Sequence, residues 1–151
     1  MEIISQIGNK VMSLPLNQKM HCLLIDDDVD DCEIFALALS GLDDQITTET
    51  ICEASDALWR LESKRLKPDI VFVDLNMPRT DGMTCLKRIR SMPGLQGMPV
   101  IIYSTSTNPR DIEACRKEGA TGYLIKPSSI ASLRSELVKL FEKHYDNIFA
   151  S

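Results

Sequence analysis

Residues 68–74 read PDIVFVD, a short apolar run that follows a lysine and ends at an aspartate. Its length suits a strand, and an uninterrupted apolar run is typical of a strand that is buried on both faces of a sheet. Asp74 then stands at the carboxyl end of this strand. In an open parallel sheet, functional side chains gather outside that end.

Four further strand-like runs accompany this one, namely HCLLID at 21–26, ITTETI at 46–51, MPVIIY at 98–103 and GYLI at 122–125. The run at 46–51 alternates polar and apolar residues and indicates an edge strand, whereas 98–103 indicates a central one. Helical patterns lie between and after the strands, at residues 30–40, 55–66, 81–91, 109–118 and 129–145. This alternation predicts an α/β fold, with a parallel sheet that helices cover on both faces.

The composition is that of one ordinary globular domain, with 151 residues, 44% hydrophobic and 26% charged. The formal net charge of −5 predicts no direct DNA binding, because backbone phosphates are bound by a concentrated basic face. No long apolar run indicates a signal peptide or a membrane span. The five cysteines include no C-x-x-C pair, which favours reduced thiols in the cytoplasm.

The strand and helix pattern divides the chain into three parts. Residues 1–19 are expected to be a flexible N-terminal extension, 20–145 the folded domain and 146–151 a C-terminal tail. The tail region leaves Tyr145, Ile148 and Phe149 beyond the last expected helical contact. These apolar residues favour a homodimer contact or the docking of a partner.

Polar residues follow the predicted strands: Asp26, Asp27 and Asp28 after the first, Asp74 after the third, Ser104 after the fourth and Lys126 after the fifth. Parallel strands share one carboxyl edge, so carboxylates, a hydroxyl and an ammonium can converge there. Clustered carboxylates raise one another's pKa values, and a hard divalent ion such as Mg²⁺ relieves their repulsion. Together these groups suit phosphoryl transfer to a carboxylate nucleophile.

Each of these residues alone has a simpler interpretation. A single aspartate at a strand end is more often a helix cap or a solvated loop residue, and we keep that interpretation for Asp28, Asp30 and Asp31. Ser104 alone favours a structural hydroxyl, and Tyr123 alone favours half-buried packing on a strand. The combination of several strand ends, rather than any one residue, favours chemistry at this edge.

The same segments resemble the response-regulator receiver domain family. The shared motifs are LLIDDD at 23–28, VDLNMPRTDG at 73–82, IIYST at 101–105 and YLIKP at 123–127. The resemblance covers residues 19–143 and implies a doubly wound, flavodoxin-like receiver fold. Its five-stranded parallel sheet would have the order 2-1-3-4-5, for which a member of this family is a known example.

The resemblance implies a role for each site residue. Asp74 would be the phosphoacceptor, and Mg²⁺ would be held by Asp27 directly, by Asp26 through water, by Asp74 and by the main-chain carbonyl of Asn76. Lys126 and Ser104 would contact the phosphoryl group. Ser104 and Tyr123 would form a switch that signals through the face built by residues 109–145. The Lys126–Pro127 peptide is usually cis in the family, and Thr105 replaces a smaller residue.

The resemblance also implies the partners. A sensor histidine kinase or a phosphotransfer protein would donate the phosphoryl group, and a further, unidentified protein would receive the signal from this stand-alone receiver. The chain would be a regulator and not an enzyme with an outside substrate. The alternative is a degenerate receiver that binds partners without phosphorylation, which the intact set of site residues disfavours.

Two other classes use a similar fold. A haloacid-dehalogenase type phosphatase needs a second aspartate as general acid where this chain has Asn76, which cannot donate a proton in that way. A flavodoxin-like FMN carrier needs a phosphate-binding loop, but Asp26, Asp27 and Asp28 would repel an anion there.

Overall fold

Five parallel strands form one sheet in the order β2-β1-β3-β4-β5. They belong to a computed structural model that describes residues 18–149. The strands are β1 (Met20–Ile25), β2 (Ile46–Ile51), β3 (Ile70–Asp74), β4 (Val100–Ser104) and β5 (Gly122–Ile125). The α/β class and the strand order confirm the predictions, with β2 at an edge and β3 in the centre.

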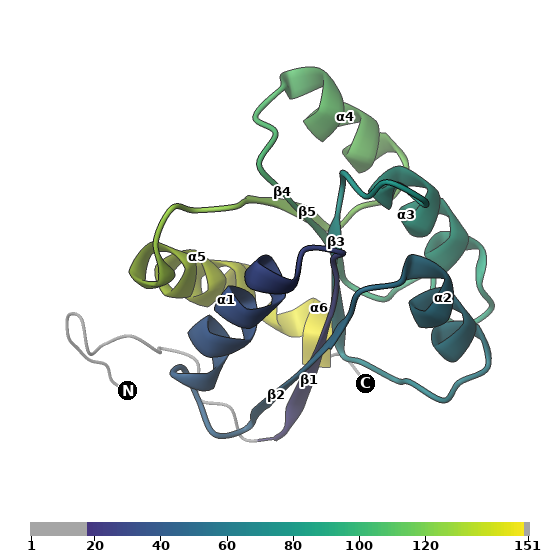
Figure 1. Cartoon of the computed structure of the whole chain (residues 1–151). Helices are drawn as coiled ribbons and strands as arrows, with labels where there is room; N and C mark the ends of the chain where they lie inside the picture. The colour runs from purple at the N-terminus through teal and green to yellow at the C-terminus, as the bar shows by residue number, and fades with distance from the viewer. Residues whose placement is uncertain (1–17, 150–151) are drawn as a thin grey trace.

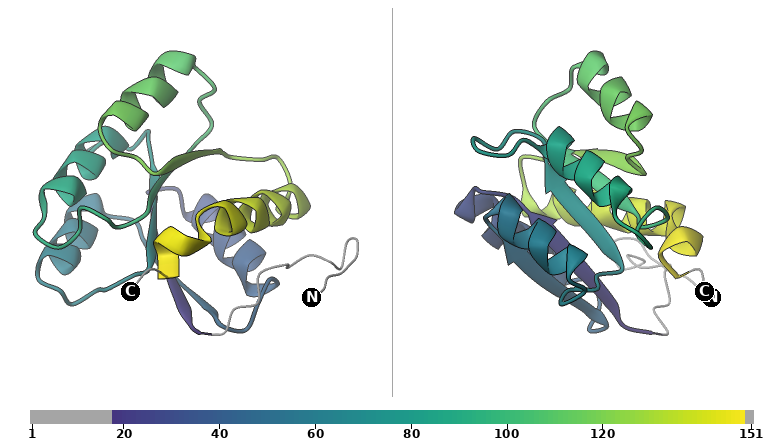
Figure 2. Two further views of the ribbon diagram at one scale, coloured as in Figure 1. Left: turned by 180° about the vertical axis from the view of Figure 1, so that it is seen from behind. Right: turned by 90° about the vertical axis from the view of Figure 1, so that its right-hand side faces the viewer.

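Helices cover both faces of this sheet (Figure 1). They are α1 (Val29–Ser40), α2 (Ala54–Glu62), α3 (Gly82–Ser91), α4 (Pro109–Lys117), α5 (Ile130–Lys143) and α6 (Tyr145–Phe149). α1 and α5 lie side by side on one face, and α2, α3 and α4 lie on the other, as the two views of Figure 2 also show. The predicted N-terminal extension falls, as far as residue 17, outside the described residues.

The continuous apolar run of β3 is explained by two separate cores. Ile70 and Phe72 pack on the side of α1 and α5, whereas Val71 and Val73 pack on the side of α2 and α3. All four side chains are fully buried. Since burial of such a side chain stabilises a fold by roughly 1.5–3 kcal/mol, both faces of this strand must be apolar. The central strand therefore fixes the position of Asp74 at its end.

α2 differs most from its predicted bounds. Its N-cap is Glu53, whose side chain makes no capping hydrogen bond, and the helix begins at Ala54, one residue before the predicted start. The helix ends at Glu62 instead of continuing to residue 66, because Lys64 adopts a left-handed conformation with φ 63°. This turn places Leu66 in the core, where it is only 8% exposed.

The C-terminal prediction is wrong in part. α5 ends at Lys143, and α6 continues through residues that were expected to form a tail from 146 onward. Ile148 is buried, because its apolar side chain packs in the core on the side of α1 and α5. It is therefore not available for a homodimer contact, while the side chains of Tyr145 and Phe149 lie outside the described part of the structure.

No helix between residues 18 and 149 has the length and apolar character that a bilayer crossing requires.

Gly82 brings α3 against the backbone that carries Asp74. A Cβ atom at this position would lie 2.3 Å from the carbonyl oxygen of Asp74 and 2.6 Å from the Cα atom of Leu75. The amide of Gly82 donates a hydrogen bond to the carbonyl of Leu75, at 2.8 Å. Any larger residue must displace main chain, which cannot move as a flexible side chain can.

We expect Gly82→Ala to lower the free energy of unfolding by about 1–3 kcal/mol, because overpacking against backbone forces a local shift. Gly97→Ala is the matched control, since a Cβ atom there meets no heavy atom within 4 Å. Urea unfolding of both variants measures the difference. Equal stability of the Gly82→Ala variant and the native chain would contradict this account of the close approach.

Candidate phosphoryl-transfer site

The ends of β1 and β3 place two carboxylates next to each other. Ile25 pairs with Val73 in the parallel ladder, so Asp26 and Asp74 are the next residues on adjacent strands. The amide of Asp26 donates to the carbonyl of Ile51 at 3.2 Å, which extends the order of the sheet to this residue. Asp26 is fully buried and Asp74 is 6% exposed.

Asp27 completes a group of three carboxylates, which we call the acidic cluster. Asp26, Asp27 and Asp74 each offer one oxygen atom, and these atoms all lie within 4.8 Å of one another. Oxygen donors at this spacing match the preference of hard divalent cations such as Mg²⁺. The donor set of the acidic cluster therefore fits the predicted metal. The fourth predicted ligand, the carbonyl of Asn76, stays a prediction.

Lys126 brings a positive charge to the acidic cluster. Its Nζ atom donates to Oδ2 of Asp26 at 2.9 Å and lies 3.7 Å from Oδ1 of Asp74. The side chain is only 10% exposed. The predicted convergence of the two strand-end carboxylates with this ammonium is thereby confirmed.

Asp31 also binds Lys126, which the sequence did not predict. Its Oδ2 atom accepts a hydrogen bond from Nζ of Lys126 at 2.7 Å. Asp28 is the N-cap of α1, and its carboxylate accepts from the amide of Asp31 at 3.0 Å. The helix cap expected for Asp28 is thus present. Asp31, which was expected to be a cap or a solvated residue, instead binds Lys126. Asp30 is exposed, as expected.

The pKa of Asp74 is raised to about 6, first by burial and then by the negative charge of Asp26. Lys126 and the amide of Asn76, which donates to Oδ1 of Asp74 at 3.3 Å, act in the opposite direction. For Lys126, burial alone would lower the pKa, but hydrogen bonds to Asp31 and Asp26 outweigh it and raise the pKa above its usual range. Near neutral pH, Asp74 is therefore largely ionised and Lys126 carries a positive charge.

A hollow of about 490 Å³ opens beside the acidic cluster. Asp27 lies in its wall, together with residues of the β2–α2 and β3–α3 connections, among them Cys52, Met77 and Arg79. Of the three carboxylates of the acidic cluster, Asp27 is the one that lines this hollow.

The two predicted switch residues, Ser104 and Tyr123, each form a hydrogen bond with the main chain of Ser106. The Oγ atom of Ser104, which is fully buried, accepts a hydrogen bond from the amide of Ser106 at 3.1 Å. The hydroxyl of Tyr123 donates to the carbonyl of the same residue at 2.9 Å. Ser106, which the sequence did not single out, thereby connects β4 with the half-buried ring on β5. The switch roles of Ser104 and Tyr123 stay predictions.

Comparison with known proteins identifies the family of this chain. Residues 22–138 match the response regulator receiver domain. The chain belongs to this family. Chemotaxis protein CheY-3 of Vibrio cholerae is 32% identical to the receiver over 133 residues, which cover 87% of this chain and 99% of CheY-3.

Two further relatives extend the comparison. The two-component response regulator ARR5 of Arabidopsis thaliana is 27% identical over 153 residues, which cover 94% of this chain and 83% of ARR5. Among solved structures, the phosphorylated cyanobacterial phytochrome response regulator RcpA matches with a TM-score of 0.73 at 26% identity. That match covers 84% of this receiver and 94% of RcpA.

The receiver differs from one expectation of the resemblance. No peptide bond between residues 18 and 149 is cis, so the Lys126–Pro127 bond is trans. The amide of Lys126 nevertheless donates to the carbonyl of Ser104 at 2.8 Å, which keeps the lysine in line with the end of β4.

We expect Asp74→Asn to stabilise the metal-free receiver above pH 6. Between the usual pKa of 3.8 and the folded value of about 6, the Asp74 carboxyl is ionised in the unfolded chain but still protonated in the folded protein. The native chain therefore loses stability as the pH rises through this window, and the neutral amide removes the loss. Thermal unfolding in the presence of a chelator, from pH 3.5 to 8, measures the effect.

The exposed Asp30 supplies the control, since Asp30→Asn should show no such gain. If Asp74→Asn were no more stable than the native receiver at pH 7, or if its advantage persisted unchanged below pH 3.8, the assigned burial and repulsion at Asp74 would be wrong.

Proposed function

We propose that this chain is a response regulator of a two-component phosphorelay, which accepts a phosphoryl group on Asp74 in the presence of Mg²⁺. The observation that carries the proposal is the acidic cluster with its three oxygen atoms within 4.8 Å, beside an ammonium 3.7 Å from Asp74. A nucleophile, a metal-binding group and a cation for the phosphoryl oxygens are the parts that phosphoryl transfer needs.

The proposed reaction begins with a carboxylate oxygen of Asp74 that attacks phosphorus on a phosphohistidine. A P–O bond forms and the P–N bond breaks, and the imidazole leaves with the electron pair of that bond and takes up a proton. Bound Mg²⁺ would supply charge neutralisation for the transferred group. The hollow beside Asp27 has room for an imidazole donor.

Lys126 and Ser104 would then bind the phosphoryl oxygens. The hydroxyl of Ser104 would turn from the amide of Ser106 to the new group, which weakens the link that Ser106 forms with Tyr123. The surface of α4, β5 and α5 would shift in population toward an active form. A downstream protein that binds this surface would read the change.

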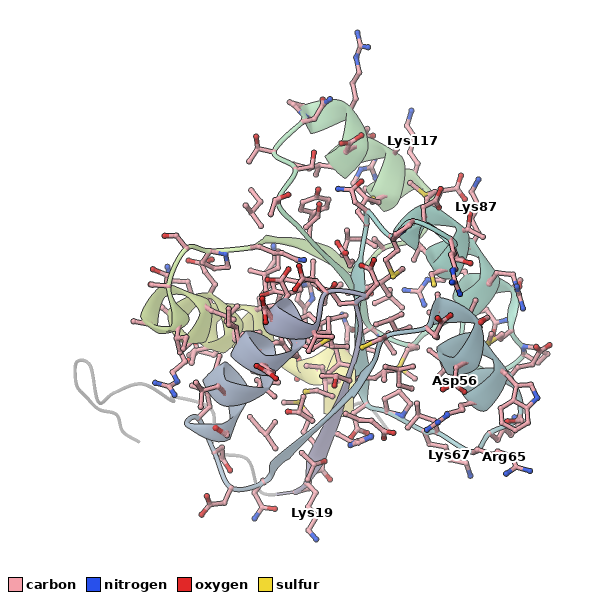
Figure 3. The ribbon with its side chains drawn as sticks, in the orientation of Figure 1. Lys19, Asp56, Arg65, Lys67, Lys87 and Lys117 are labelled. Atoms are coloured by element: carbon pink, nitrogen blue, oxygen red, sulfur yellow. The ribbon has the colours of Figure 1, made fainter. Side chains whose placement is uncertain are left out.

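The proposed partners are a sensor histidine kinase or a phosphotransfer protein and a separate target protein. We propose no turnover of an outside substrate and no direct DNA binding. The net charge of −5 supports the latter, and in Figure 3 the labelled Lys87 and Lys117 point outward from different helices, α3 and α4. The cysteines are free thiols, which supports the proposed cytoplasmic location.

Mass spectrometry after treatment with acetyl phosphate tests the proposal. The native chain should gain one phosphoryl group when Mg²⁺ is present and none when it is chelated, because the acidic cluster cannot accept a further anion without a cation. Asp74→Asn should gain none, whereas Asp30→Asn should react as the native chain does. A native chain that is never labelled would instead favour a binding platform that works without phosphorylation.

A further inference from the structure

The ammonium of Lys126 is shared between two carboxylates that are not equivalent. The shorter contact, 2.7 Å, is with Asp31 on α1, and the longer, 2.9 Å, is with Asp26 at the end of β1. Asp74, the proposed phosphoacceptor, is 3.7 Å from Nζ, which is beyond hydrogen-bond distance. In this arrangement Lys126 is held beside its target but does not bind it.

Asp31 differs from Asp26 in where it lies. Asp26 is one of the three carboxylates of the acidic cluster, so a cation in the cluster would compete with Lys126 for it. Asp31 does not belong to that group and is 32% exposed at the start of α1. When a divalent cation draws on Asp26, Asp31 is the carboxylate that still retains Lys126.

We infer that Asp31 is a positioning residue that holds Lys126 away from Asp74 and competes with the phosphoryl group for its ammonium. The inference rests on the proposed function, because it concerns the lysine that would bind the phosphoryl oxygens. Formation of the phosphorylated state then includes the loss or weakening of the Asp31–Lys126 contact. Asp31 thereby sets how strongly the site retains a phosphoryl group.

Charge adds to the competition for the lysine. The site already contains the three carboxylates of the acidic cluster, and Asp31 adds a fourth negative charge in contact with Lys126. Asp31→Asn removes the charge and leaves an amide oxygen that can accept only a weaker hydrogen bond from the ammonium.

Binding of beryllofluoride, a phosphoryl analogue that coordinates a carboxylate oxygen, tests the inference with the full chain and saturating Mg²⁺. Asp31→Asn should bind it about three- to tenfold more tightly than the native chain. Asp30→Asn is the matched control, because it removes a neighbouring charge from the same helical turn and should bind as the native chain does. Equal or weaker binding by Asp31→Asn overturns the inference.

Beryllofluoride binding by the native chain distinguishes a failure of this inference from a failure of the proposed function. If the native chain bound no beryllofluoride in the presence of Mg²⁺, the proposed function itself would fail. If it bound the analogue and the Asp31→Asn variant gained nothing, only the role of Asp31 would fail.

A double-mutant cycle shows whether Asp31 acts through Lys126. In a Lys126→Gln background, the additional Asp31→Asn change should alter beryllofluoride affinity by less than about twofold, since independent sites add and coupled ones do not. A gain as large as in the native background would mean a general charge effect and would overturn the inference.

A second measurement needs neither metal nor analogue. In the metal-free chain with labelled lysine, the NMR signal of the Lys126 ammonium should exchange with water faster in Asp31→Asn than in the native chain, and Asp30→Asn should leave it unchanged. An unchanged exchange rate in Asp31→Asn would show that this carboxylate does not hold the lysine.

Discussion

Repulsion among the carboxylates at the carboxyl edge of the sheet is the constraint on which the site depends. Asp26 is fully buried and Asp74 nearly so, and solvent therefore screens their charges poorly. Burial and the charge of Asp26 accordingly raise the pKa of Asp74 to about 6. A cation must balance this edge, and Lys126 supplies a positive charge in the protein itself.

The fold makes this balance possible through its strand order. Since β1 and β3 are neighbours, the two buried carboxylates are adjacent, whereas β5 is separated from β3 by β4. Lys126 must therefore reach across the end of β4, where its Nζ atom lies 5.1 Å from the centre of the Tyr103 ring. A long side chain with an apolar stem suits this path, and the aromatic face is a favourable neighbour for the cation. Gly82 meanwhile lets α3 approach the backbone of Asp74.

Much of this architecture could be predicted from local patterns. The apolar runs gave the strands because each residue of a central strand such as β3 enters one of two cores. Strand ends then indicated Asp26, Asp74 and Lys126, since parallel strands share one edge. Asp31 was not predicted because its partner, Lys126, is 95 residues away in the sequence. The only signal was its place three residues after the N-cap Asp28.

The other differences between the predicted and the observed structure also have specific physical causes. α2 ends early because the backbone of Lys64 is left-handed. This conformation is uncommon for a residue other than glycine, so a lysine does not predict it. The sequence predicts a tail at Ile148 because α6 is too short to show a periodic pattern, whereas the structure buries this residue in the core. The connection from Ser104 to Tyr123 runs through main-chain atoms of Ser106, so no side-chain pattern could indicate it.

A titration of the full chain with Mg²⁺, followed by amide NMR, tests the central claim most directly. The account predicts saturable binding of a single ion, with the largest shifts at residues 26–27 and 74–76 and at Lys126. It also predicts that Asp27→Asn weakens this binding strongly. Shifts spread evenly over the exposed acidic residues, or no saturable change at the three carboxylates, would show that the cluster is not a metal site.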